Sequence, residues 1–259
     1  MRIVIFCQQL EYMGGIERVV LEHLRIFTAK GLSVELLVDR PISLMKEYVS
    51  CPWTVLPSNS KEREDVLENY LKTKRPDLLI FHGVSHEHSV QDVTIAEKND
   101  IKSVCVIHFP FVSNLALSAG KYNSWHEFYS KGLGCTAFAT VSAIDAVFWR
   151  GLGKKAFHVQ NPFVHPSKNV EMSQRGGEDG TANLLWVGRL CEQKQPKSAL
   201  AAFAQAMKKC PNITLTMVGG DVKGIKALQK EYKLRILFFI SSIDFILILL
   251  MMMYEKIEM

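Results

Sequence analysis

The sequence runs Leu184-Leu185-Trp186-Val187-Gly188-Arg189-Leu190 and then Glu192-Gln193-Lys194-Gln195-Pro196 over the stretch that indicates the fold most clearly. This pattern predicts a short buried strand, a glycine turn, a basic loop and a helix that begins at Pro196. A parallel strand that leads into a helix places backbone N–H groups and the positive helix end at one edge of a sheet. Because Arg189 and Lys194 lie in the loop, this edge is a candidate binding site for a diphosphate. The alternative is an ordinary loop with solvated basic residues.

Short apolar, β-branched runs alternate with amphipathic segments over the first 160 residues. The first helix is the clearest, because Ile16, Val19, Val20, Leu24 and Phe27 fall on one face and Gly31 follows its end. Strand and helix alternating in this way predict an α/β fold with a mostly parallel, doubly wound sheet and helices on both faces. The expected strands are residues 3–7, 34–38, 54–56, 78–81, 103–107, 137–141 and 157–160, and the further helices are 61–74, 87–99 and 143–151.

The alternation is interrupted between residues 161 and 183, where prolines, glycines and a polar run predict a linker. We expect an N-terminal Rossmann-like domain over 1–162, a linker over 163–182 and a second, incomplete Rossmann-like domain over 183–233. The pattern restarts with a strand at 184–187, a helix at 197–208, a strand at 213–218, the pair Gly219-Gly220 and a helix at 222–232.

Residues 234–259 form an atypical tail that is apolar from 236 to 253 apart from Ser241, Ser242 and Asp244. Three interpretations stay open. The run approaches the ~20 residues of a membrane-spanning helix, although a central Asp244 would cost roughly 3 kcal/mol on insertion. The tail could instead cover the open edge of the sheet, or be the product of a frameshift.

Net charge and cysteine content indicate which partners and which cellular location to expect. The chain of 259 residues has a net charge of +5 and no basic block interleaved with aromatic residues, so we expect no nucleic-acid partner. The six cysteines include no C-x-x-C pair, and only five apolar residues follow Met1-Arg2, which is too short for a signal peptide. We therefore expect a cytoplasmic protein, whose weakly basic surface allows peripheral association with the inner face of a membrane.

Six short motifs occur in an order that is similar to one enzyme family. They are Gly14-Gly15-Ile16-Glu17-Arg18-Val19, His108 after the strand at 103–107, Thr140-Val141-Ser142, Asn161-Pro162, Val187-Gly188-Arg189-Leu190 with Lys194, and Val218-Gly219-Gly220. Together they resemble the GT-B glycosyltransferases, and in particular the large retaining family four, over residues 1 to 232.

The resemblance implies a role for each matched residue. Arg189 and Lys194 would neutralise the donor diphosphate and stabilise the leaving group, and His108 would lie against the transferred sugar as the third catalytic residue. Gly188, Gly219 and Gly220 would let the backbone approach the nucleotide closely. On the acceptor side, in the N-terminal domain, we expect Gly14, Gly15 and His82.

The implied activity is transfer of a sugar from a nucleotide-sugar donor to a glycan or lipid-linked acceptor, in surface polysaccharide or lipopolysaccharide assembly. No cofactor is implied. The family normally carries a Glu-x₇-Glu element further along the second domain, and no glutamate pair in this chain has that spacing. We therefore expect the chain as written to bind a donor weakly and to transfer no sugar.

Other interpretations of single motifs are less favoured. The run from His82 to His88 suggests zinc, but a strand, a loop and a helix start would have to converge, so we expect no metal and interpret these residues as polar loop residues that line a cleft. Asp39 at the end of the second strand suggests a nicotinamide dehydrogenase, yet the first strand is not followed by G-x-G-x-x-G. A non-catalytic, membrane-associated glycan-binding remnant is the remaining alternative. Aromatic residues at 120–129 fit either a sugar-stacking segment or, preferably, a helix packed on the sheet.

Overall fold

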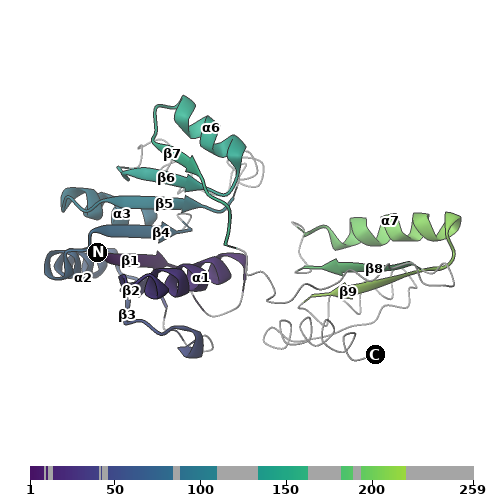
Figure 1. Cartoon of the computed structure of the whole chain (residues 1–259), viewed down its shortest axis with the longest axis horizontal. Helices are drawn as coiled ribbons and strands as arrows, with labels where there is room; N and C mark the ends of the chain where they lie inside the picture. Colours follow the sequence, from purple (N-terminus) through teal and green to yellow (C-terminus); the bar gives the residue numbers. More distant parts are fainter. Residues whose placement is uncertain are drawn as a thin grey trace. The chain divides into compact units, whose positions relative to one another are not determined.

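The computed structural model describes residues 1–8, 10, 14–40, 42, 46–83, 88–109, 134–162, 182–188 and 194–219. The chain divides into two compact units, Met1–Val164 and His165–Met259 (Figure 1). Three predicted features lie outside the described residues: the helix at 222–232, the aromatic segment at 120–129 and the apolar tail at 234–259.

The first unit contains a seven-stranded parallel sheet of order β3-β2-β1-β4-β5-β6-β7. From β1 the chain adds strands outward to β3, and then returns to place β4 on the other side of β1. The strand order therefore reverses between β1 and β4, and open α/β sheets bind ligands at the carboxyl ends of the strands at such a point. The strands are β1 (Arg2–Cys7), β2 (Ser33–Val38), β3 (Trp53–Val55), β4 (Leu78–His82), β5 (Ser103–Ile107), β6 (Ala137–Thr140) and β7 (Ala156–His158).

Helices cover both faces of this sheet (Figure 1), as predicted. Alternate side chains of β1 show why, because Ile5 packs in the same core as Leu24 of α1, whereas Phe6 packs on the opposite face with Leu67 of α2. The face of α2 also carries α3 and α6. The described helices of this unit are α1 (Gly15–Ala29), α2 (Ser60–Lys74), α3 (Ser89–Lys98) and α6 (Ala143–Gly151), with a short 3₁₀ turn η1 (Lys46–Tyr48) before β3.

In the first unit, two elements have a boundary that lies two residues from the predicted position, and the other predicted boundaries lie within one residue of the observed ones. The last strand of the sheet occupies Ala156–His158 and not 157–160, because it pairs with β6 from Phe138↔Ala156 to Thr140↔His158 and ends where β6 ends. Helix α3 begins at Ser89, two residues later than expected. For the last strand, the partner strand β6 sets the limit, which local composition does not record.

The described part of the second unit is a β-α-β unit of β8 (Ala182–Val187), α7 (Pro196–Lys209) and β9 (Ile213–Val218). The strands are parallel, and α7 has Pro at its first position as predicted. The prediction that β8 is buried was wrong, since Leu185 is 58% exposed and Leu184 and Val187 are also exposed. The apolar contacts of this unit among described residues lie on the α7 side of the sheet, at Leu200, Phe203, Leu215 and Met217, with Trp186 and Ile213 packed against them.

Candidate functional site

Three histidines meet at the carboxyl ends of the central strands. The α1 face of β4 carries Ile80, so the alternation of the strand also places His82 on that face. The next strand carries Val106 on the same face, and two residues later His108 follows its end. Helix α1 packs there and brings His23 beside His82.

The three rings form a continuous hydrogen-bonded row. His23 Nδ1 lies 3.1 Å from His82 Nε2, and His82 Nδ1 lies 2.9 Å from His108 Nε2. Rings stacked face to face would keep their atoms at about 3.5 Å or more. The shorter distances show that the rings meet edge to edge through their nitrogens, although the His82 and His108 planes are only 28° apart. His23 also packs against Phe27, with ring centroids 5.5 Å apart.

All three imidazoles favour the neutral form. Burial lowers the pKa of His82 well below its ordinary value of 6.5, and the neighbouring His108 and His23 lower it further. Burial likewise lowers the pKa of His108 to about 4, and that of His23 falls despite the opposing effect of Glu22. Both ring nitrogens of His82 are used by other histidines. The row is therefore arranged for hydrogen bonding, and the described residues include no group of three or more His, Cys, Asp or Glu side chains that could hold a metal ion.

This geometry corrects one sequence expectation. We interpreted the run from His82 to His88 as polar loop residues that line a cleft. His82 is instead the last residue of β4 and only 1% exposed, and His88 is also buried. His23 was not predicted as a site residue, although the sequence contains a signal for it. It lies three residues after Val20 and four before Phe27, on the apolar stripe of the first helix.

Glycines shape the same edge of the sheet. Gly14 is the N-cap of α1 and Gly15 its first residue, so the pair opens the helix. Directly after His82, Gly83 has φ +72°, a left-handed conformation that residues with a Cβ rarely adopt. The chain therefore leaves β4 through a turn that favours glycine.

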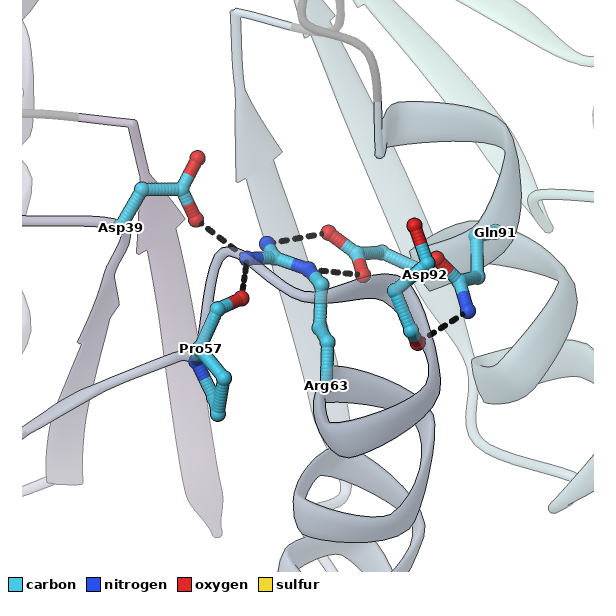
Figure 2. A network of polar contacts seen from close by, with 6 residues as sticks. Asp39, Pro57, Arg63, Gln91 and Asp92 are labelled. Atoms are coloured by element: carbon cyan, nitrogen blue, oxygen red, sulfur yellow. Dashed lines mark hydrogen bonds and ion pairs between the residues drawn. The ribbon is translucent and has the colours of Figure 1, made fainter.

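A buried ionic cluster joins the neighbouring strand end to two helices (Figure 2). Arg63 of α2 is fully buried and donates two hydrogen bonds, of 2.8 and 2.7 Å, to the carboxylate of Asp92 on α3. Its Nη1 lies 2.7 Å from Asp39, which follows β2, and donates to the carbonyl of Pro57 at 3.1 Å. Asp39, whose position after the second strand suggested a nicotinamide dehydrogenase, thus lies in an ion pair with Arg63. Neither Arg63 nor Asp92 was predicted from the sequence as a site residue.

The second unit presents its own strand-end glycines. The Gly188 N–H donates to the carbonyl of Val218 at 2.9 Å, so β8 and β9 stay paired up to the start of the basic loop. A side chain on Gly219 would collide with the Gly188 carbonyl, which makes this a position where the backbone needs glycine. Lys194 is exposed and comes just before α7. Arg189 and Gly220 lie outside the described residues.

Comparison with solved structures identifies the architecture. The lipopolysaccharide outer core galactosyltransferase WaaB, in its apo form, matches with a TM-score of 0.66 and 17% identity over 92% of this chain and 68% of that one. The chain has the GT-B fold. Anabaena HepE in complex with UDP-glucose matches at 0.60 and 15% identity over 95% and 71% of the two chains. Sucrose-phosphate synthase from Thermosynechococcus elongatus matches at 0.68 and 14% identity over 93% and 71%.

At these identities the likeness concerns the fold. No protein-family model and no curated protein matches the sequence. Within the described ranges, no helix is long and apolar enough to cross a membrane. The GT-B fold confirms the predicted α/β class and its Rossmann-like units, and the assignment of individual site residues stays a prediction.

Proposed function

We propose that this protein is a glycosyltransferase of the retaining type that takes its sugar from a nucleotide-sugar donor. The observation that supports this most is the position of the matched motifs within a GT-B fold. Gly14 lies at the start of α1 and His108 after the end of β5, beside the reversal of strand order, and Gly188 and Gly219 lie at the strand ends of the second unit. Among the solved structures similar to this chain, one contains HepE with the nucleotide-sugar UDP-glucose and another contains HepE with UDP.

The proposed roles follow the chemistry of each group. Arg189 and Lys194 bind the donor diphosphate and stabilise the negative charge that grows on it as the glycosidic bond breaks. The backbone at Gly188, Gly219 and Gly220 approaches the nucleotide, and His108 contacts the transferred sugar. Gly14, Gly15 and His82 belong to the acceptor side. No metal or cofactor is part of this proposal.

The acceptor is a glycan or a lipid-linked glycan, and the place of action is the cytoplasmic side of a membrane. Two observations support this finer proposal: the net charge of +5, which favours anionic surfaces, and the fold shared with a lipopolysaccharide galactosyltransferase. Because the chain has no Glu-x₇-Glu pair, donor affinity rests largely on the diphosphate contacts. We expect weak donor binding and no measurable transfer by this chain.

Calorimetric titration of the purified chain with uridine, guanosine and adenosine diphosphate sugars tests the donor site. Lys194→Ala and Arg189→Ala should each weaken binding of the preferred donor by about 10- to 100-fold, since hydrogen bonds to charged groups contribute roughly 1.5–3 kcal/mol. Lys208→Ala removes an exposed lysine near the other end of α7 and is the matched control. Unchanged affinity in both loop variants, or equal loss in the control, would reject this loop as the diphosphate site.

A further inference from the structure

The two hydrogen bonds in the row of three histidines restrict where the ring protons can lie. Each gap in the row, His23 Nδ1 to His82 Nε2 and His82 Nδ1 to His108 Nε2, needs one proton to be a hydrogen bond. A neutral imidazole carries one proton, on Nδ1 or on Nε2. Burial favours the neutral form of all three rings. The protons of the row are therefore not independent of one another.

The allowed arrangements can be enumerated from His82, which lies in the middle. If His82 carries its proton on Nε2, it donates to His23, so His23 must carry its own proton on Nε2. His82 Nδ1 then accepts, and His108 must donate from its Nε2. If His82 carries its proton on Nδ1, the same argument places the protons of His23 and His108 on Nδ1. Only two states satisfy both hydrogen bonds, and in each state all three rings have the same tautomer.

We propose that His82 and His23 are positioning residues that hold His108 in one ring orientation and in one tautomer shared by the whole row. The shared tautomer determines whether His108 Nδ1, which makes no hydrogen bond within the row, carries a proton. In the all-Nε2–H state that atom accepts a hydrogen bond, and in the all-Nδ1–H state it donates one. The tautomer at His23, on a helix, thus decides which kind of hydroxyl contact His108 can make at the strand end.

The consequence for the ligand rests on the proposed function, in which His108 contacts the transferred sugar. A sugar hydroxyl can donate or accept a hydrogen bond. A His108 Nδ1 in a fixed tautomer can pair with the hydroxyl in only one of these two roles. The row would therefore contribute to binding of the sugar and not of the nucleotide.

Nuclear magnetic resonance tests the shared tautomer without any ligand. In the full chain labelled with ¹⁵N at its eight histidines, correlations between ring nitrogens and carbon-bound ring protons at pH 7.5 report the tautomer of each ring. We expect the same single tautomer at His23, His82 and His108. A mixed set of tautomers among the three, or a cationic ring at this pH, would overturn the proposal.

Two substitutions of His82 separate positioning from simple packing. Glutamine keeps one donor and one acceptor in the middle of the row, so His82→Gln should leave His23 and His108 with matching tautomers. Phenylalanine keeps a ring but no nitrogen, so His82→Phe should leave them unmatched and averaged. His158→Gln, which removes an exposed histidine at the end of β7, should change nothing in the row. Matching tautomers in His82→Phe would show that the row does not set them.

Ligand titration then tests the consequence. His82→Phe should weaken binding of the preferred nucleotide-sugar about tenfold and leave binding of the free nucleoside diphosphate unchanged. His82→Gln should bind the nucleotide-sugar nearly as tightly as the wild type. Equal weakening of both ligands would reject the positioning role toward the sugar. If no nucleotide-sugar binds at all, the proposed function fails, while the resonance experiment still decides whether the row shares one tautomer.

Discussion

At the scale of single residues, the histidine row links protonation to folding. His82 is buried beside two other imidazoles, and a positive charge there would lie in an apolar layer between α1 and the sheet. The folded chain therefore keeps this ring neutral at pH values where the unfolded chain would protonate it.

Stability should fall as the pH decreases below 6.5. The folded pKa values of these histidines lie below 6.5, that of His108 at about 4, so between these limits the unfolded state binds more protons than the folded state. For each histidine that stays neutral in the folded state, the free energy of unfolding falls by about 1.4 kcal/mol for each pH unit of acidification in this window. Urea unfolding at pH 7.5 and 5.5 measures it, and His82→Gln should show a smaller loss than the wild type. A loss of equal size in His82→Gln, with His158→Gln as the control, would contradict this assignment.

The second unit depends on one residue without a side chain. In Gly219→Ala the new Cβ would meet the Gly188 carbonyl, which is backbone and has little room to move. We expect a destabilisation of about 1–3 kcal/mol, as for other overpacked positions, with faster hydrogen exchange of the β8 and β9 amides. Gly151→Ala is the matched control, because a Cβ there meets nothing within 4 Å. Unchanged exchange in both variants would show that the two strand ends separate easily.

At the scale of elements, the Arg63 cluster connects α2 to α3 and to the end of β2 (Figure 2). The guanidinium also lies over the ring of Phe6 in β1, 5.6 Å from its centroid. A buried arginine of this kind is stable only while its carboxylates remain, because an unpaired buried charge has lost its water.

Asp92→Asn should therefore destabilise the first unit strongly. Removing one partner of a buried ion pair typically costs about 3–5 kcal/mol, and here the amide would still face Arg63. Asp65→Asn changes an exposed carboxylate on α2, the helix that carries Arg63, and should change stability by less than about 0.5 kcal/mol. The free energy of unfolding of both variants in urea measures the difference. Similar values for the two would mean that Asp39 alone keeps Arg63 paired.

At the scale of the whole molecule, the two units differ in how much core their described residues form. The first has apolar layers on both faces of a seven-stranded sheet. In the second, the buried apolar cluster of the described residues is Leu200, Phe203, Leu215 and Met217. Stability comes mainly from buried apolar surface, so the first unit should fold independently more readily than the second.

We expect residues 1–164, expressed alone, to fold cooperatively. Circular dichroism during urea unfolding should show one transition, and the histidine resonances of the row should match those of the whole chain. Residues 165–259 expressed alone are the comparison and should show a weaker and less cooperative transition. A first unit that fails to fold alone would show that it needs the rest of the chain for its stability.

Sequence pattern alone determined most of the fold, because the signals for these elements are local. Apolar periods of two and 3.6 residues predicted the seven strands and the four helices that the structure describes in the first unit, and Pro196 marked the start of α7. Gly14 and Gly15 open α1 at the position of the glycine pair in the sequence, whereas close approach of the backbone at Gly219 to a nucleotide stays a prediction. The ordered motifs also pointed to the GT-B architecture, which the solved structures confirm as a fold.

Only the tertiary structure decided which polar side chains meet. His23 lies on a helix, His82 ends β4 and His108 follows β5. Their contacts depend on the face that each strand turns toward α1 and on the strand order that places β4 between β1 and β5. Arg63, Asp39 and Asp92 likewise come from three separate elements. Such contacts follow from long-range register and packing, and a local pattern contains no information about which distant side chain will fill the space beside it.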